Sequence, residues 1–434
     1  MIKLNFPGIT QEQFEDAFAV LDECIATPPC LGFIHPFMSP GGDYDGGCWW
    51  ERDSALTLSG YCWLDQKFAE NALENFTYVQ KENGRIPLWG HDRVADFPEQ
   101  LSAIPVIYEV ARRICRRTAD KKYIRRIYDM LVRYMDWWLS PIKRDARTGL
   151  ICGIMEEADP SDYLVERTYA QVDLNVQVCV GADVLRELSE YLGEYDAAVR
   201  YHKLFHELRE IINKWLYDED DKYFYTRQVV EDVFMKNRPH NVTFDTFKRG
   251  IIAKERIPDM LALLKDNSKY GYYNRYGITS APYDSPEFCE TVGGYAGTPS
   301  WSGNIWTFRN EIICRGLHES GLLEEAAHIA YQTVMTFNGN YAEFINPSTG
   351  LGQGVLRYGW TASQYVELII EEIFGIDYCA WNDTLKVTPN IPKELYGETI
   401  SVSNVSLGNG KFVHVTVECG EDPKVSYHTT TEMY

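Results

Sequence analysis

The segment Leu322-Leu-Glu-Glu-Ala-Ala-His-Ile-Ala330 has the pattern of an amphipathic helix, with apolar residues on one face and charged residues on the other. By contrast, Gly60-Tyr-Cys-Trp-Leu64 belongs to a less polar helix that carries aromatic residues. An amphipathic helix covers a core from outside, whereas a helix that is apolar all round is buried. The alternation of these two kinds of helix predicts inner and outer helices that pack in pairs.

Helical periodicity dominates from residue 10 to residue 375. About a dozen helices in inner and outer pairs describe an all-α fold, the (α/α)6 toroid. No exact sequence repeat is visible, so this prediction depends on the number of helices and on their alternation. We expect helices over residues 11–26, 54–64, 66–82, 98–117, 123–139, 172–192, 195–216, 256–264, 304–320, 322–338 and 361–374.

After Gly375 the pattern changes to alternating apolar and polar residues between Gly and Pro breaks, which is typical of short antiparallel β-strands. The clearest strands are Thr384-Leu-Lys-Val-Thr-Pro, Thr399-Ile-Ser-Val-Ser-Asn-Val-Ser and Phe412-Val-His-Val-Thr-Val-Glu. We therefore predict two units: a helical barrel over residues 1–378 and a small β appendage over residues 379–434 that packs on the barrel.

The composition excludes several classes of partner. The net charge of the 434 residues is −21, so nucleic acid and anionic membranes would repel the chain. No segment reaches the roughly 18 apolar residues of a membrane span, and the N-terminus lacks the apolar stretch of a signal peptide. The 11 Cys are scattered without metal-ligand spacing, which is typical of reduced, buried thiols. We expect a soluble cytoplasmic protein, and the sequence predicts no oligomeric state.

The most informative carboxylate is Glu343, in the loop Tyr341-Ala-Glu-Phe-Ile-Asn-Pro-Ser-Thr-Gly350 that is closed by Tyr358-Gly-Trp-Thr-Ala-Ser363. Aromatic rings stack on the apolar faces of sugars, while amide and hydroxyl groups bind sugar hydroxyls. The chain as a whole has 29 Tyr and 11 Trp, more than a core alone needs. The loop therefore indicates a site for a small carbohydrate, and the alternative is a loop that caps the core.

Two further segments place acids or aromatic residues at helix starts or in loops. In Gly46-Gly-Cys-Trp-Trp-Glu-Arg-Asp-Ser54, Asp53 is either a helix N-cap or, with Arg52, a ligand of sugar hydroxyls, with Trp49 or Trp50 as a platform. In Asn83-Gly-Arg-Ile-Pro-Leu-Trp-Gly-His-Asp92, Trp89 and His91 either form one wall of the site or pack the loop.

Two more segments complete the set. Ile154-Met-Glu-Glu-Ala-Asp-Pro-Ser-Asp162 holds Glu156, Glu157 and Asp159. Crowded carboxylates raise at least one pKa, which suits a general acid near neutral pH; the alternative is a solvated acidic loop. Trp301-Ser-Gly-Asn-Ile-Trp306 is suited to stacking and to an amide hydrogen bond, or both Trp pack in the core.

Because helix starts converge on one rim of a toroid, two distant carboxyls can flank one ligand there, as glycosidic cleavage requires. At this point the chain resembles inverting glycosidases of the trehalase and processing α-glucosidase type, glycoside hydrolase families 37 and 63. These families include short bacterial members acting on glucosylglycerate or mannosylglycerate. The likeness covers most of residues 45–375.

Four motifs carry the resemblance. Trp50-Glu-Arg-Asp-Ser54 is similar to a Trp-Asp-Ser helix start, and Asn75-Phe76 with Gly84-Arg-Ile-Pro87 to an Asn-Phe…Gly-x-Ile-Pro run. Trp301-Ser-Gly-Asn-Ile-Trp306 is similar to Trp-Arg-Gly-Pro-Ile-Trp. The most specific match is Ala342-Glu-Phe-Ile-Asn-Pro-Ser-Thr-Gly350 with Gly359-Trp-Thr-Ala362, which resembles Glu-x-Tyr-x-Pro-x-Thr-Gly…Gly-Trp-(Ser/Thr)-Ala.

The resemblance implies hydrolysis with inversion, with Glu343 as general base and Asp159 as general acid, and Glu156 and Glu157 as alternative acids. Inversion implies carboxyls about 6.5–9.5 Å apart. No cofactor is expected, and no metal, because no His/Asp/Glu cluster has the spacing of metal ligands. The acid segment is shorter than the family's Glu-Ser-Gly-x-Asp-Asn-Ser, and Ser302 replaces a sugar-binding Arg, which allows a substrate other than trehalose. The expected sugar-binding residues are Trp50, Arg52, Asp53, Trp89, His91, Asn175, Trp301, Asn304, Trp306, Tyr358 and Trp360.

The sequence therefore predicts an exo-acting inverting glycoside hydrolase, with α-glucosidase activity on a small α-glucoside or oligosaccharide. One alternative is an α-rhamnosidase or another (α/α)6 glycosidase, which the β appendage favours. A sugar epimerase acting through paired histidines is a weaker alternative, since the chain has 9 His. The non-enzyme alternative is a carbohydrate-binding protein that lacks its acid.

Overall fold

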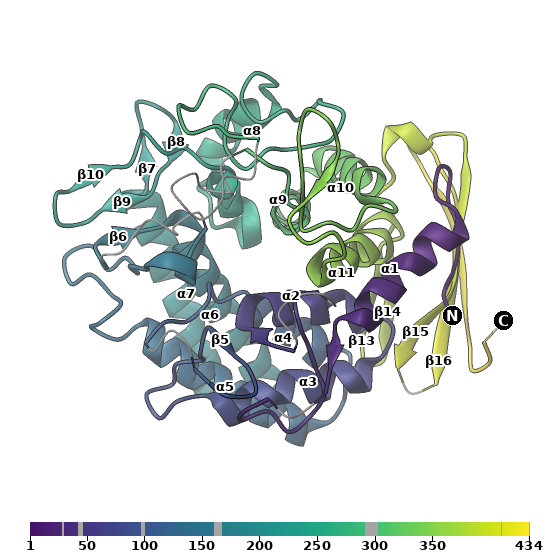
Figure 1. Ribbon diagram of the computed structural model, residues 1–434, viewed down its shortest axis with the longest axis horizontal. Helices are drawn as coiled ribbons and strands as arrows, with labels where there is room; N and C mark the ends of the chain where they lie inside the picture. Colours follow the sequence, from purple (N-terminus) through teal and green to yellow (C-terminus); the bar gives the residue numbers. More distant parts are fainter. Residues whose placement is uncertain are drawn as a thin grey trace.

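The computed structural model describes residues 1–27, 30–41, 47–96, 100–159, 167–290, 303–408 and 410–433. These residues form a mostly helical body with an antiparallel sheet built largely from the C-terminal end of the chain (Figure 1). Within these ranges, no helix is long and apolar enough to cross a membrane.

Six of the described helical segments form a closed ring, because each contacts the next and the last contacts the first. In two of these helices, Glu51–Tyr61 and Gly359–Glu367, every residue is buried, as expected of helices surrounded on all sides. In ring order they are α2 (Glu51–Tyr61), α4 (Ile107–Arg116), α6 (Val172–Leu192), the 3-10 segment η2 (Asn241–Gly250), α9 (Thr307–Glu319) and α11 (Gly359–Glu367).

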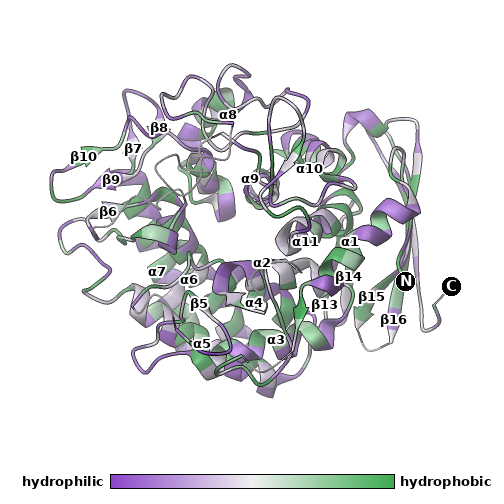
Figure 2. Cartoon of the chain, viewed as in Figure 1, coloured by the Kyte–Doolittle hydropathy of each residue, from purple (hydrophilic) through white to green (hydrophobic). Residues whose placement is uncertain are grey.

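The other helices lie outside this ring. The segment Leu322–Ala330 confirms the predicted pattern, because Glu324 is exposed while Ala326 and Ile329 are buried against the core. In Figure 2 the outer helices carry both hydrophobic and hydrophilic residues. They are α1 (Gln11–Glu23), α3 (Gln66–Val79), α5 (Lys121–Trp138), α7 (Tyr195–Trp215), α8 (Ile257–Lys265) and α10 (Leu323–Phe337).

Most predicted helix bounds lie within three residues of the observed ones, two helices differ by more, and one inner segment was not predicted. The helix expected over 98–117 starts only at Ile107, because Pro105 disfavours helical backbone at the residue before it. The helix expected over 361–374 starts at Gly359 and ends in a π-helical turn, η4 (Leu368–Ile373). Segment η2 has no amphipathic pattern because all its residues from Asn241 to Lys248 are buried, polar ones included.

The sheet has the antiparallel order β1–β15–β16–β17. The strands predicted near 399 and 412 are confirmed, whereas β14 pairs with β13 outside this sheet. The N-terminal strand β1 joins the sheet, so the division at residue 378 stays a prediction. The bounds are β1 (Lys3–Asn5), β13 (Ile376–Cys379), β14 (Thr384–Val387), β15 (Thr399–Gly408), β16 (Lys411–Glu418) and β17 (Lys424–Thr430).

Short strands and turns connect the helices. The two-residue strands are β2 (Ile25–Ala26), β3 (Phe37–Met38), β4 (Trp49–Trp50), β5 (Trp89–Gly90), β6 (Tyr169–Ala170), β7 (Tyr217–Asp218), β8 (Tyr223–Phe224), β9 (Arg227–Gln228), β10 (Val233–Phe234), β11 (Phe344–Ile345) and β12 (Gly352–Gln353). The short 3-10 turns are η1 (Met155–Glu157), η3 (Lys254–Arg256) and η5 (Lys393–Leu395).

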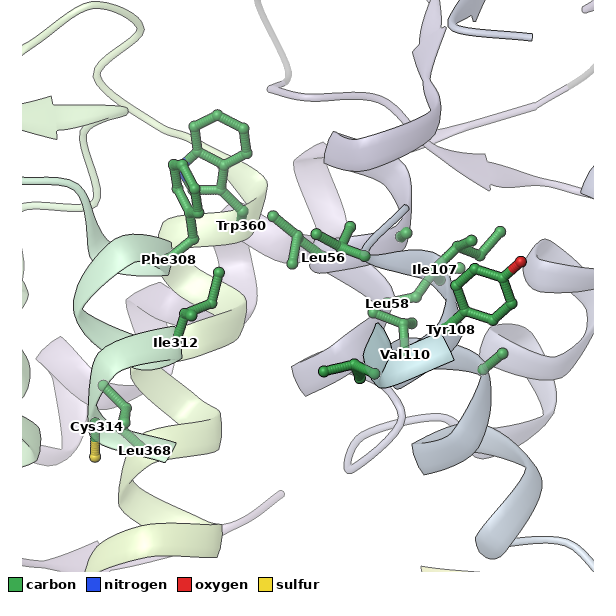
Figure 3. Close-up of a cluster of buried hydrophobic side chains, with 14 of the residues drawn as sticks. Leu56, Leu58, Ile107, Tyr108, Val110, Phe308, Ile312, Cys314, Trp360 and Leu368 are labelled. Atoms are coloured by element: carbon green, nitrogen blue, oxygen red, sulfur yellow. The ribbon is translucent and has the colours of Figure 1, made fainter. Parts of the chain in front are cut away.

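The inner helices bury both apolar side chains and ion pairs against one another. Figure 3 shows Leu58 of α2 near Tyr108 of α4, and Phe308 of α9 near Trp360 of α11. Buried guanidinium and carboxylate groups pair with one another; the main pairs are Arg113 Nη2–Glu311 Oε1 at 2.9 Å, Arg315 Nη2–Glu367 Oε1 at 2.6 Å and Arg315 Nη2–Glu371 Oε2 at 3.1 Å. Such pairs fix the relative positions of α4, α9 and α11, because an unpaired buried charge is costly.

Candidate active site

The start of α2 holds the central cation of the site. The N-cap residue of α2 is Trp50, and Asp53 lies in the first turn of this helix. The alternative interpretation of Asp53 as the N-cap is therefore wrong. Arg52 is 5% exposed; its Nη1 donates to Asp159 Oδ1 over 2.5 Å and its Nη2 to Glu156 Oε2 over 3.1 Å. Two of the three candidate acids therefore contact one guanidinium.

Asp53 connects α2 to the start of α11. The hydroxyl of Tyr358, the N-cap residue of α11, donates to Asp53 Oδ1 over 2.6 Å. Burial raises the pKa of Asp53, and the charge of Arg52 and the hydrogen bond from Tyr358 oppose that rise. Two helix starts therefore meet here, as the sequence predicted for one rim of the ring.

Glu343 lies directly before β11, at the open end of the β11–β12 hairpin. Its backbone N–H donates to Val355 O over 2.8 Å, and the N–H of Val355 donates to Glu343 Oε2 over 3.2 Å. Burial raises the pKa of Glu343 to about 7; the charge of Asp53 adds to this, and Val355 and Arg52 oppose it. Glu343 therefore lies within electrostatic range of the α2 start, with a pKa suited to a general base near neutral pH.

A second polar cluster lies behind Asp159. The backbone N–H of Asp159 donates to Asp173 Oδ2 over 2.5 Å. Arg309 Nη1 lies 3.9 Å from Asp159 Oδ2 and 3.1 Å from Asp245 Oδ2, and Arg309 Nε donates to Asn241 over 3.1 Å. Sequence reasoning assigned none of these four supporting residues a role. In the sequence, Asp173 and Arg309 could have been found as charged residues within helices that are otherwise buried.

Glu157, the third candidate acid, points into the protein instead. Its side chain is fully buried, pairs with Lys143, and accepts N–H groups of Ser102 at 3.4 Å and Ile154 at 3.1 Å. This network ties the acid segment to the extended chain before α4. The groups that bind Glu157 therefore hold the acid segment in place, whereas Asp159 and Glu156 contact Arg52.

Aromatic side chains flank the carboxyls on two sides. Trp50 and Trp89 are paired across β4 and β5, with ring centroids 6.0 Å apart, and the ring of His91 lies 4.8 Å from that of Trp89. On the other side, Trp360 packs on Phe308 and lies 5.6 Å from the guanidinium carbon of Arg52. Trp50 and Trp89 are partly exposed, whereas Trp49 and Trp360 are 0% and 1% exposed, so the prediction of a sugar platform stays open for Trp50 and is wrong for Trp49, and Trp360 packs in the core.

The remaining predicted ligands fall into three groups. Trp306 is 1% exposed and packs on Phe344 and Trp360, and Asn304 is fully buried nearby in sequence. Asn175 binds backbone only, through Ile151 N, Ile151 O and Gln171 O, so it supports the acid segment instead of facing a ligand. Trp301, with Ser302, lies outside the described residues.

A small cavity opens beside Asp159, and none of the described residues that line it is a tryptophan. Arg238, whose Nε pairs with Glu287 at 3.1 Å, contributes a positive charge to its wall. The lining includes Asp159, Gln171, Tyr223, Tyr225, Arg238 and His240.

The fold and this site, with carboxyls, a guanidinium and tryptophans at the meeting point of helix starts, are those of a glycoside hydrolase. The chain belongs to the mannosylglycerate hydrolase MGH1-like glycoside hydrolase family, whose domain model matches residues 48–166 and 155–361. This membership confirms the resemblance found in the sequence.

Three relatives illustrate the likeness. Mannosylglycerate hydrolase from Rubrobacter radiotolerans is 24% identical over 200 residues, which cover 45% of this chain and 43% of that enzyme, less than half its length. The crystal structure of a family 63 mannosylglycerate hydrolase from Thermus thermophilus in complex with glucose has a TM-score of 0.65 at 19% identity, covering 82% of this chain and 99% of that one. A family 78 rhamnosidase from Bacillus sp. GL1 has a TM-score of 0.70 at 14% identity, covering 98% of this chain and 41% of that one. At these identities the two solved structures establish a shared fold.

Proposed function

We propose that the protein is an exo-acting inverting glycoside hydrolase built on an (α/α)6 toroid, with Asp159 as general acid and Glu343 as general base. One observation carries this proposal: neighbouring residues at the start of α2 connect the two carboxyls. Arg52 binds Asp159, and both Arg52 and Asp53 perturb the pKa of Glu343. The cycle of contacts among six inner helices supports the toroid.

In this mechanism Glu343 removes a proton from a water molecule as that water attacks the anomeric carbon. Asp159 gives a proton to the glycosidic oxygen on the opposite face of the sugar, so the configuration inverts. The pKa of about 7 lets Glu343 accept a proton near neutral pH and pass it to solvent afterwards. Trp50 and Trp89, which keep part of their surface exposed, supply flat apolar surfaces for sugar rings, and Asp53 supplies a carboxylate for hydroxyls.

The substrate class we favour is a small α-glycoside, an α-glucoside or α-mannoside, with a compact anionic aglycone such as glycerate. The names of the mannosylglycerate hydrolases among the relatives support this choice. The cavity beside Asp159 supports it too, because the leaving group departs on the side of the general acid. Arg238 on the wall of that cavity suits a carboxylate.

An α-rhamnosidase is the second candidate, favoured by the match to a family 78 rhamnosidase over 98% of this chain, the C-terminal sheet included. A carbohydrate-binding protein without activity is the third.

One experiment separates the candidates. Proton NMR follows the first-formed anomer while the enzyme acts on glucosylglycerate, mannosylglycerate, kojibiose, trehalose and an aryl α-rhamnoside. We expect a β-anomer from an α-glucoside or α-mannoside. A retained anomer contradicts the assigned roles, turnover of the rhamnoside alone selects the second candidate, and sugar binding without turnover selects the third.

A further inference from the structure

The fully buried carboxyl of Asp173 lies directly behind the proposed acid. It sits in the first turn of α6, and its Oδ2 accepts the backbone N–H of Asp159 over 2.5 Å. Its other oxygen, Oδ1, is buried and meets no hydrogen-bond donor among the described residues. An ionised carboxylate with one unsolvated oxygen is costly, whereas a neutral carboxylic acid tolerates such a position better.

The charges around Asp173 favour the same state. The facing groups are Asp159 in the acid segment, Asp245 on η2 and Arg309 on α9; Arg52 on α2 faces Asp159 from the other side. Arg52 is paired with Asp159 and Arg309 with Asp245, so a charged Asp173 would have no cation of its own. Burial raises the pKa of Asp173 well above its usual range, and the charges of Asp159 and Asp245 add to that effect.

We propose that Asp173 is a positioning residue for Asp159 and works as a neutral carboxylic acid, holding the acid's backbone N–H on Oδ2 while its own proton stays on the buried Oδ1. This inference rests on the proposed function for its catalytic meaning. It assigns Asp173 two tasks: it fixes the segment that carries the acid, and it adds no negative charge beside that acid.

Two substitutions separate these tasks. Asp173→Asn keeps an acceptor oxygen and is neutral, so it should retain kcat within about 3-fold, with a pH profile of kcat/KM that superimposes on that of the wild type. Asp173→Ala leaves the Asp159 N–H unsatisfied and should lower kcat by about 10- to 100-fold with little change in KM. Asn175→Ala is the matched control, because it loosens the same segment through Ile151 without touching the Asp159 N–H.

Infrared spectroscopy gives a readout that does not depend on turnover. The carbonyl stretch of a neutral carboxylic acid should be present in the wild type at neutral pH and lost in Asp173→Asn. If no such band is lost, or if the alkaline limb of kcat/KM moves to lower pH in Asp173→Asn, Asp173 is ionised and the inference is wrong. Equal activity of Asp173→Ala and the wild type would also overturn it. If the wild type cleaves no glycoside, the proposed function fails, and the infrared comparison still decides the state of Asp173.

Discussion

Arg52 Nη1 donates a hydrogen bond of 2.5 Å to Oδ1 of Asp159, a residue 107 positions further along the chain. This contact joins the start of α2 to the segment before α6. An oxygen that accepts a guanidinium N–H is not free to protonate a leaving group. In the proposed mechanism the proton for the leaving group is therefore carried by Oδ2 of Asp159, which lies 3.9 Å from Arg309 Nη1.

The first prediction decides which carboxyl is the acid. Asp159→Asn should lower kcat about 10²- to 10⁴-fold on substrates with poor leaving groups and much less on aryl glycosides, whose leaving groups need no proton. Glu156→Gln is the matched control, because Glu156 contacts the same guanidinium but is partly exposed. Steady-state kinetics on both substrate types tests this. The reverse result, with Glu156→Gln the more impaired, would move the acid to Glu156.

The second prediction concerns the pH dependence of the base. Because the pKa of Glu343 is raised to about 7, the residue is protonated below that pH and cannot accept a proton from water. The acid limb of kcat/KM should therefore fall as the pH drops below about 7. Glu343→Gln should lose activity by about 10²- to 10⁴-fold at all pH values.

The same pKa predicts a gain in stability on removing the base. The folded-state pKa of about 7 lies above the ordinary 4.5, so burying the charge destabilises the fold fully above pH 7 and not below pH 4.5. The difference of 2.5 corresponds to at most about 3 kcal/mol at 1.36 kcal/mol per pKa unit. Urea unfolding of Glu343→Gln should show this gain at pH 8, shrinking as the pH falls toward 4.5. A variant that is less stable than the wild type at pH 8 would contradict the burial of this charge.

The third prediction tests the link between the two helix starts. Tyr358→Phe removes the 2.6 Å hydrogen bond to Asp53, leaving a buried carboxyl with one donor fewer. The free energy of unfolding should fall by about 1–3 kcal/mol, and kcat/KM should fall as well. Tyr365→Phe removes a bond of 3.0 Å to Asn338 instead and should change stability alone. If the two variants have the same kcat/KM, Asp53 and Tyr358 do not contribute to the site.

The sequence predicted the parts of the site that are local. The loop around Glu343 and the aromatic start of α2 are contiguous motifs, and the inner and outer helices follow from periodicity. The supporting cluster of Asp173, Asp245 and Arg309 was not predicted. Its members lie on three different inner helical segments, where burial on all sides leaves no periodic pattern to mark a polar residue as special.

Local sequence patterns gave wrong predictions where contacts with residues distant in the sequence decide the structure. Asp53 followed by Ser54 has the composition of a helix start, yet the helix begins earlier, at Glu51, because the N–H of Glu51 bonds Leu88 O from another segment. Asn175 was predicted to bind sugar, but its amide is used by the backbone of Ile151. In both cases the deciding partner is more than 20 residues away in the sequence.

The final prediction tests how closely the base must be placed. Gly354 has φ +71° beside Glu343, and a Cβ there would clash with Glu343 Oε2 and lie 2.8 Å from Phe344 Cε1. Gly354→Ala should displace the base and lower kcat by about 10²-fold, because a shift of about 1 Å at a reacting group costs that much. Gly321→Ala is the matched control, since Gly321 has φ +78° and no atom lies within 4 Å of its added Cβ. Both variants carry a similar backbone strain, so both should lose stability on thermal unfolding, Gly354→Ala more because of its clash, while only Gly354→Ala loses activity. Similar kcat values for the two variants would show that the catalytic step does not require Glu343 at its present position.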